Sequence, residues 1–292
     1  MGIDTDCCPV CDGQRSTMYG RRKLWHLTQC SECSSVYRTV FPSEDELTEI
    51  YGSDYYDSWN IEADTDAFWQ MKVRNCISYI ATLDRYITDA GIEPRTLLDV
   101  GCAHGFMLDA ATRQGYIPSG LEISPAGDAA RQRGFNVVPA RLEDGPFPSE
   151  SFDVVTMIDV IEHLADPRSA LKSVRAMLKP GGLVFVVTPD ISSVSARILR
   201  SAWPHYLPEH LIYYSSSSLS KLFSMSNMPV LEIGSGYKYL TVNYILGHLR
   251  YSPGGIIPNM ISVLAGMLPS RITQNPLRYM TEMIAIGRKE DL

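Results

Sequence analysis

The sequence lacks any apolar run long enough to cross a bilayer, for which a helix needs about 20 consecutive residues. The nearest approach, residues 256–268, is shorter and is interrupted by Pro258 and Asn259. The first residues also lack the charged and then apolar pattern of an export signal, and no internal repeat is present. These absences predict a cytoplasmic globular protein without a transmembrane segment. A peripheral membrane contact through residues 242–275 stays open.

Excess positive charge is missing as well. The chain has 26 Lys and Arg against 33 Asp and Glu, a net charge of −7 and a sequence pI near 5.4. Its only basic cluster is residues 21–23. Because attraction to phosphate backbones depends on a basic surface, nucleic acid is not expected as the main partner.

Cysteine is scarce but clustered. Four of the seven cysteines form two Cys-x2-Cys pairs, Cys8 with Cys11 and Cys30 with Cys33. Each such pair can supply two thiolates to one tetrahedral zinc ion at about 2.3 Å. We predict a structural zinc ribbon over residues 1–40; reduced thiols or a disulfide pair are the alternative. Cys76 and Cys102 are assigned to core packing.

The most informative segment is a glycine turn between a strand and a helix. An apolar strand over residues 96–100 leads into Gly101-Cys102-Ala103-His104-Gly105, and a helix begins at once. Closely spaced glycines let the backbone approach a ligand and direct main-chain N–H groups at it. The Gly-x-x-x-Gly spacing differs from the Gly-x-Gly-x-x-Gly of dinucleotide folds, so it indicates a nucleotide-like ligand other than NAD.

Apolar strands and helices alternate from residue 96 onward. Strands are predicted at 96–100, 119–123, 136–138, 152–158, 183–188, 230–233 and 283–286. Helices are predicted at 106–114, 125–133 and 167–178, and the serine run 215–218 is predicted to cap another helix that extends to about Met225. Near-continuously apolar strands separated by helices indicate a parallel sheet covered on both faces. The expected class is α/β, with one domain over residues 93–292 and an insertion at about 242–275.

Residues 41–92 are predicted to link the ribbon to this domain. Ser43 and Glu46 have the spacing of a helix capping box, and a second helix is predicted at 68–88. Between them lies a Tyr-rich segment, residues 51–59. Tyr and Trp rings have flat apolar faces with a polar edge, which suits a sugar or ring-shaped acceptor. We therefore predict an acceptor lid formed by Tyr55, Tyr56, Trp59 and Trp203, with core packing as the alternative for part of this set.

Five motifs in order resemble those of the class I S-adenosylmethionine (SAM)-dependent methyltransferases. They are residues 97–105, 121–124, 143–155, 159–167 and 178–182. The resemblance implies a Rossmann-like, seven-stranded sheet with an antiparallel last strand, and a ligand at the carboxyl ends of the strands. The ribbon followed by a Tyr-rich segment is similar to a subgroup of bacterial sugar, polysaccharide and natural-product methyltransferases.

The resemblance also implies residues that hold SAM. Asp99 would orient the loop or a water near the ammonium group, and Glu122 would accept hydrogen bonds from both ribose hydroxyls. Gly101 and Gly105 would pass under the methionine moiety. The remaining predicted cofactor contacts are Cys102, Ala103, Phe106, Ile123, Leu142, Glu143 and Asp159.

Catalysis needs mainly alignment and exclusion of water, with a base only where the acceptor hydroxyl has a high pKa. His210 and His163, which follow predicted strands, are the candidate bases. A second interpretation starts from Asp159, Glu162 and His163. This pattern resembles the acidic-x-x-Glu-His run of ubiquinone-biosynthesis O-methyltransferases, where such a cluster can bind a divalent cation and lower the pKa of a catechol-like hydroxyl.

The sequence therefore predicts a SAM-dependent methyltransferase with a small-molecule acceptor. O-methylation of a sugar or specialised metabolite is the leading hypothesis. The alternatives are metal-assisted O-methylation of a quinone or catechol-like substrate, an RNA methyltransferase that uses its ribbon, and a non-catalytic cofactor-binding scaffold. The acceptor, the methylated atom, homo-oligomerisation and the role of residues 242–275 stay open.

Overall fold

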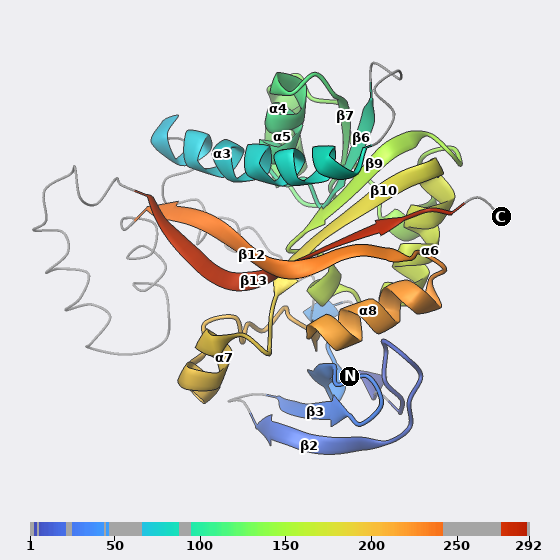
Figure 1. The fold of residues 1–292 in the computed structure, drawn as a ribbon, viewed down its shortest axis with the longest axis vertical. Coiled ribbons are helices and arrows are strands. Elements are labelled where there is room, and N and C mark those ends of the chain that lie inside the picture. The colour runs from blue at the N-terminus through green and yellow to red at the C-terminus, as the bar shows by residue number, and fades with distance from the viewer. Residues whose placement is uncertain are drawn as a thin grey trace, which may run out of the picture.

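A computed structural model describes residues 3–4, 6–21, 25–43, 45–46, 66–87, 95–241 and 276–290. Its main sheet consists of β6 (Thr96–Val100), β7 (Ile117–Leu121), β8 (Val137–Val138), β9 (Phe152–Ile158), β10 (Leu178–Pro189), β12 (Val230–Thr241) and β13 (Pro276–Arg288). The order is β12-β13-β10-β9-β6-β7-β8 (Figure 1). β13 runs antiparallel to both β10 and β12, and the other neighbouring strands of this sheet pair in parallel. The predicted α/β class and the antiparallel last strand are confirmed.

Helices cover both faces of this sheet (Figure 1). Successive strand side chains point to opposite faces, so Leu97 and Leu98 belong to different parts of the core. On one face pack α3 (Asp66–Leu83) and α4 (Phe106–Arg113), and on the other α6 (Pro167–Met177) and α8 (Ser216–Met225). The remaining helices are α5 (Ala126–Gln132), α7 (Val194–Leu199), η1 (Asp84–Tyr86), η2 (Leu142–Asp144), η3 (Ile161–His163) and η4 (Arg200–Ala202).

The cysteine-bearing ribbon has a sheet that is completed by a distant segment. Its strands are β2 (Ser16–Arg21), β3 (His26–Cys30), β4 (Val36–Arg38) and β11 (Ile212–Tyr213), in the order β11-β4-β3-β2. A further pair joins β1 (Ile3–Asp4) to β5 (Val40–Phe41). The unpredicted strand β11 pairs antiparallel with β4. The buried ribbon cysteines share one apolar cluster with α6 and α8, and Figure 1 shows β2 and β3 beneath α8.

Several predicted element ends agree with the structure, and others differ. The ends of β6 and β9 match the prediction, and Ser43 and Glu46 make the predicted reciprocal capping bonds of 2.7 and 3.4 Å. β12 and β13 are much longer than predicted, because their polar residues break the apolar pattern while the two strands bond to each other. The Tyr-rich segment 51–59 and the insertion 242–275 lie outside the described residues. Among the described helices, none combines the length and apolarity needed to cross a bilayer.

Candidate cofactor and acceptor site

The glycine loop after β6 is held in a conformation that few residues adopt. Gly101 has φ 68°, Ala103 φ 45° and Gly105 φ 91°, all in the left-handed region. The main-chain N–H groups of Gly101 and Cys102 both donate to the carbonyl of Leu121, at 2.8 and 3.0 Å. These bonds tie the loop to the end of β7, so the predicted cofactor segments lie together.

Glu122 connects the same two segments through its carboxylate. Its Oε2 accepts from the N–H of Ala103 at 2.9 Å, and its Oε1 accepts from the N–H of Ser124 at 2.8 Å. The residue is buried, with 7% of its surface exposed. A carboxylate oxygen can accept more than one hydrogen bond, so these contacts leave room for the predicted ribose hydroxyls.

Asp99 lies beneath the loop, inside the sheet. Thr156 Oγ1 donates to its Oδ1 at 2.6 Å. Burial raises the pKa of Asp99 to about 7, against the lowering effect of this hydrogen bond, and nearby Glu122 adds to the rise. Asp99 is thus a buried residue of β6, two residues before the glycine loop, and its predicted role toward the loop stays a prediction.

The other predicted cofactor residues lie in varied environments. Phe106 packs against Trp69 of α3, with ring centroids 4.6 Å apart, and so fixes the start of α4. Ile123 and Glu143 are exposed, whereas Leu142 is buried in the core. Asp159 pairs with Lys238 of β12, at the end of β9.

The two predicted bases lie side by side. The rings of His163 and His210 are perpendicular, with centroids 4.7 Å apart. Burial lowers the pKa of His163 to about 4 and lowers that of His210 well below its usual value. A ring nitrogen of His210 bonds to the main chain of His205, and its Nδ1 has no partner within the described residues. His210 therefore presents a neutral, buried nitrogen lone pair.

The predicted cation ligands are only partly brought together. Within the described residues, Glu162, His163 and His210 offer ligand atoms that lie within 4.8 Å of one another. Thr188 Oγ1 donates to Glu162 Oε2 at 2.9 Å, and Glu162 Oε1 has no partner in the described part of the chain. Asp159 is not in this group. The donor set thus differs from the predicted Asp159, Glu162 and His163 by one member.

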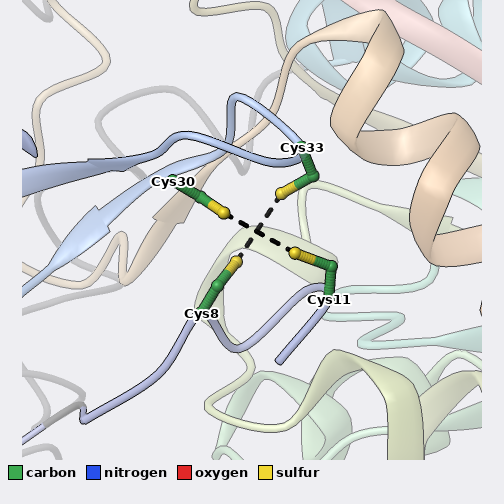
Figure 2. A group of neighbouring side chains, drawn as sticks. All are labelled: Cys8, Cys11, Cys30 and Cys33. Carbon is green, nitrogen blue, oxygen red and sulfur yellow. Dashed lines mark hydrogen bonds between the residues drawn. The ribbon is translucent and has the colours of Figure 1, made fainter. Parts of the chain in front are cut away.

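The four ribbon cysteines point toward one common centre (Figure 2). The Sγ atoms of Cys8 and Cys33 are 3.6 Å apart, as are those of Cys11 and Cys30. All four Sγ atoms lie within 4.8 Å of one another, and the cysteines are free of disulfides. Zn–S bonds of 2.3 Å in a tetrahedron give Sγ separations of about 3.8 Å, so these residues fit a zinc ion.

The ribbon also contacts the segment that carries His210. Arg38 of β4 donates from Nη1 to the carbonyl of Pro208 at 2.6 Å, and its N–H donates to the carbonyl of Leu211 at 3.0 Å. Ser217, at the start of α8, donates to the carbonyl of Cys33 at 3.3 Å. The cysteine cluster is therefore bound to the loop that positions a candidate base.

Sequence reasoning missed two charged residues at the same edge of the sheet. Lys238 of β12 pairs with both Asp159 and Glu282, and Tyr79 donates to Glu282 at 3.3 Å. A lysine and a glutamate within otherwise apolar or glycine-rich strand sequence were the available signal. The predicted strands ended too early to include Lys238.

Fold and site together define an α/β methyltransferase that uses SAM. Residues 73–233 match the family described as "Methyltransferase domain", and the chain belongs to this family. The predicted enzyme class is confirmed.

Curated relatives carry one recurring name. This chain is 29% identical over 177 residues to the ubiquinone biosynthesis O-methyltransferase of Paracidovorax citrulli. The aligned region covers 54% of this chain and 73% of that protein. The protein of the same name from Pseudomonas fluorescens strain Pf0-1 is 30% identical over 183 residues, covering 56% and 76%.

Solved structures share the fold. The Burkholderia thailandensis 1,6-didemethyltoxoflavin-N1-methyltransferase, crystallised with 1,6-didemethyltoxoflavin and S-adenosylhomocysteine, has a TM-score of 0.52 at 12% identity, covering 95% of this chain and all of that one. A SAM-dependent methyltransferase from Thermotoga maritima also has a TM-score of 0.52, at 18% identity, covering 81% and 96%. At these identities the likeness concerns the fold alone.

Proposed function

We propose that this enzyme methylates a hydroxyl group of a small-molecule acceptor, a sugar or another specialised metabolite, and that His210 removes the hydroxyl proton. The observation that carries the proposal is the Nδ1 of His210, which has no hydrogen-bond partner among the residues that the structure describes and lies beside the ring of His163. SAM supplies a methyl group already activated by its sulfonium. The glycine loop and Glu122 hold SAM in this proposal, as the sequence predicts.

Aromatic rings pack beside His210. Tyr206 lies 5.2 Å from both Trp203 and Tyr213, measured between ring centroids, and Tyr213 is 6.0 Å from His210. Trp203 and Tyr213 are only 2% and 1% exposed, so they belong to a core cluster beneath the His210 loop. Their packing fixes this loop and excludes water from the proposed base.

We also propose that the ribbon holds a structural zinc ion on Cys8, Cys11, Cys30 and Cys33. All four positions are thiolates, so no site remains for a substrate. The ribbon then stabilises the His210 loop through β4 and β11. This assignment is consistent with the resemblance to ribbon-bearing sugar, polysaccharide and natural-product methyltransferases and with a cytoplasmic location.

Substitution of His210 tests whether it is the general base. His210→Gln is expected to lower kcat by about 10²–10⁴-fold, because general base catalysis is lost. The Kd for S-adenosylhomocysteine should stay unchanged by calorimetry. His26→Gln, at an exposed position of β3, is the matched control and should keep full activity.

The assay uses labelled SAM with nucleotide-sugars, phenols and RNA as acceptors. Methyl transfer to no acceptor, with intact binding of S-adenosylhomocysteine, would favour the scaffold alternative, and transfer to RNA would favour the RNA alternative. A His210→Gln enzyme as active as wild type would contradict the base assignment.

A second candidate function is metal-assisted O-methylation of a catechol-like acceptor. The names of the curated relatives favour it, and so does the group of Glu162, His163 and His210. A cation held there would lower the pKa of the acceptor hydroxyl, but it would also occupy the lone pair of His210.

Removal of divalent cations distinguishes the two functions. We expect turnover to persist after treatment with a chelator too weak to extract thiolate-bound zinc, because His210 needs no cation to accept a proton. Turnover that is lost and then restored by Mg²⁺ would reverse the choice in favour of the second function.

A further inference from the structure

Asp159 has a strained backbone at the end of the central strand β9. Its φ is 55°, although it has a side chain, and its N–H donates to the carbonyl of Val187 at 2.9 Å. Such backbone conformations are energetically unfavourable for a residue with a side chain and cluster at functional sites. Its carboxylate lies 2.5 Å from Lys238 Nζ and is partly open, with 44% of the side chain exposed.

Lys238 is placed by a bulge in the β12–β13 hairpin. The register between these strands shifts between Gly236 and Lys238. A bulge re-aims the side chains that follow it, and bulges are frequent next to active sites. The Lys238 side chain is 16% exposed, and its Nζ contacts the buried Glu282 as well as Asp159. Within the described residues its third N–H has no partner.

This charge cluster of Asp159, Lys238 and Glu282 lies at the same edge of the sheet as the histidine pair. Asp159 directly follows β9, and η3, which carries His163, begins two residues later. Glu282 pairs across the sheet with Pro189, and the preceding Thr188 donates to Glu162 on the opposite face. Burial lowers the pKa of His163 and the charge of Asp159 opposes that shift, while the charge of Lys238 adds to the lowering in His210. The cluster and the histidine pair therefore both lie where β9 and β10 end.

A structural role alone does not account for these features. Replacing a buried ion pair with well-packed apolar residues is often neutral or stabilising. Here the ammonium is combined with a strained residue and a bulge, and one of its carboxylate partners opens toward solvent. The buried ion pair, the strained backbone of Asp159 and the bulge are each unfavourable for stability. Their occurrence at one place favours a functional role.

We propose that the Lys238 ammonium is a catalytic group that binds the acceptor oxygen. This inference rests on the proposed O-methylation. Lys238 donates its third N–H to the hydroxyl oxygen, while Asp159 and Glu282 keep the ammonium charged and aimed.

Methyl transfer moves one proton and two electron pairs. The hydroxyl proton passes to His210 Nδ1, an oxygen lone pair forms the O–C bond, and the C–S electron pair returns to sulfur. Lys238 stabilises the negative charge that develops on oxygen. Asp159 thus has an ammonium of the chain itself as its cation, where the sequence motif suggested a divalent metal ion.

The test compares Lys238→Met and Lys238→Arg, with Lys221→Met of α8 as an exposed control. Lys238→Met is expected to lower kcat about 100-fold, as for loss of one donor to a developing oxyanion. The Kd for S-adenosylhomocysteine should change less than about two-fold. Lys238→Arg should retain most of the activity because it keeps the charge, and Lys221→Met should equal wild type.

Acceptors of decreasing hydroxyl pKa provide a second readout. The loss of kcat in Lys238→Met should shrink for an acceptor that is already ionised at the assay pH, because no negative charge develops during transfer. A structural role would lower kcat equally for every acceptor. Should Lys238→Met fail to fold, Lys238→Met/Glu282→Gln keeps the cluster's net charge and takes its place.

The kcat of Lys238→Met tests the role of Lys238, and the activity of the wild type tests the proposed hydroxyl methylation. Wild-type kcat in Lys238→Met, or an equal fractional loss on every acceptor, overturns the role of Lys238 while hydroxyl methylation by the wild type stands. A wild-type enzyme that methylates no hydroxyl acceptor overturns both.

Discussion

Replacing Cys33 with serine is expected to abolish the proposed zinc site and to unfold the ribbon. Structural zinc sites contribute apparent binding free energies of about 10–16 kcal/mol, whereas whole domains are stable by only about 5–15 kcal/mol. The ribbon shares its sheet with β11, so we expect the loss to spread to residues 208–213. Methyl transfer should then fall more than about ten-fold, because His210 loses its support.

The measurements are zinc content, hydrogen exchange and activity. Wild type should hold one zinc per chain, and Cys33→Ser should lose it together with amide protection in β4 and β11. Affinity for S-adenosylhomocysteine should change little, because the bonds that hold the glycine loop come from the ends of β6 and β7. Cys7→Ser, an exposed cysteine next to the cluster, is the matched control. Full activity in a zinc-free Cys33→Ser enzyme would contradict the coupling.

Much of the fold was predictable because its signals are local. The apolar runs of β6 and β9 end at turns, so their bounds follow from residues 96–100 and 152–158 alone. The reciprocal bonds of Ser43 and Glu46 follow from a spacing of three residues. The glycine loop is equally local, since its conformation depends on glycines that the sequence shows directly.

The parts that were missed depend on contacts between distant residues. β11 is two residues long and forms only because β4, far away in the chain, offers it a partner. Lys238 belongs to a strand whose polar residues show no apolar alternation. The predicted grouping of Asp159 with Glu162 and His163 used neighbours in the sequence. In space Asp159 faces β12, and His210 from another loop joins the other two.

Gly101→Ala is expected to destabilise the protein more than Gly115→Ala, because its added methyl group disrupts the glycine loop after β6. Gly101 has φ 68°, where a side chain costs about 1–2 kcal/mol. An added Cβ would also lie 2.6 Å from Val160 Cγ2, and such overpacking costs about 1–3 kcal/mol more. The free energy of unfolding should therefore fall by about 2–5 kcal/mol. Affinity for S-adenosylhomocysteine should fall at least about ten-fold, because the loop that is proposed to pass under its amino-acid moiety is displaced.

Gly115→Ala separates strain from collision. Gly115 has φ 82°, but an added Cβ there meets nothing within 4 Å, so only the backbone cost of about 1–2 kcal/mol applies. Adding Val160→Ala to Gly101→Ala removes the colliding methyl group and should recover part of both the stability and the affinity. Denaturant unfolding and calorimetry measure the two effects. If Gly101→Ala loses no more stability than Gly115→Ala, the close approach of Val160 does not constrain this loop, and the glycine is required for its backbone angles alone.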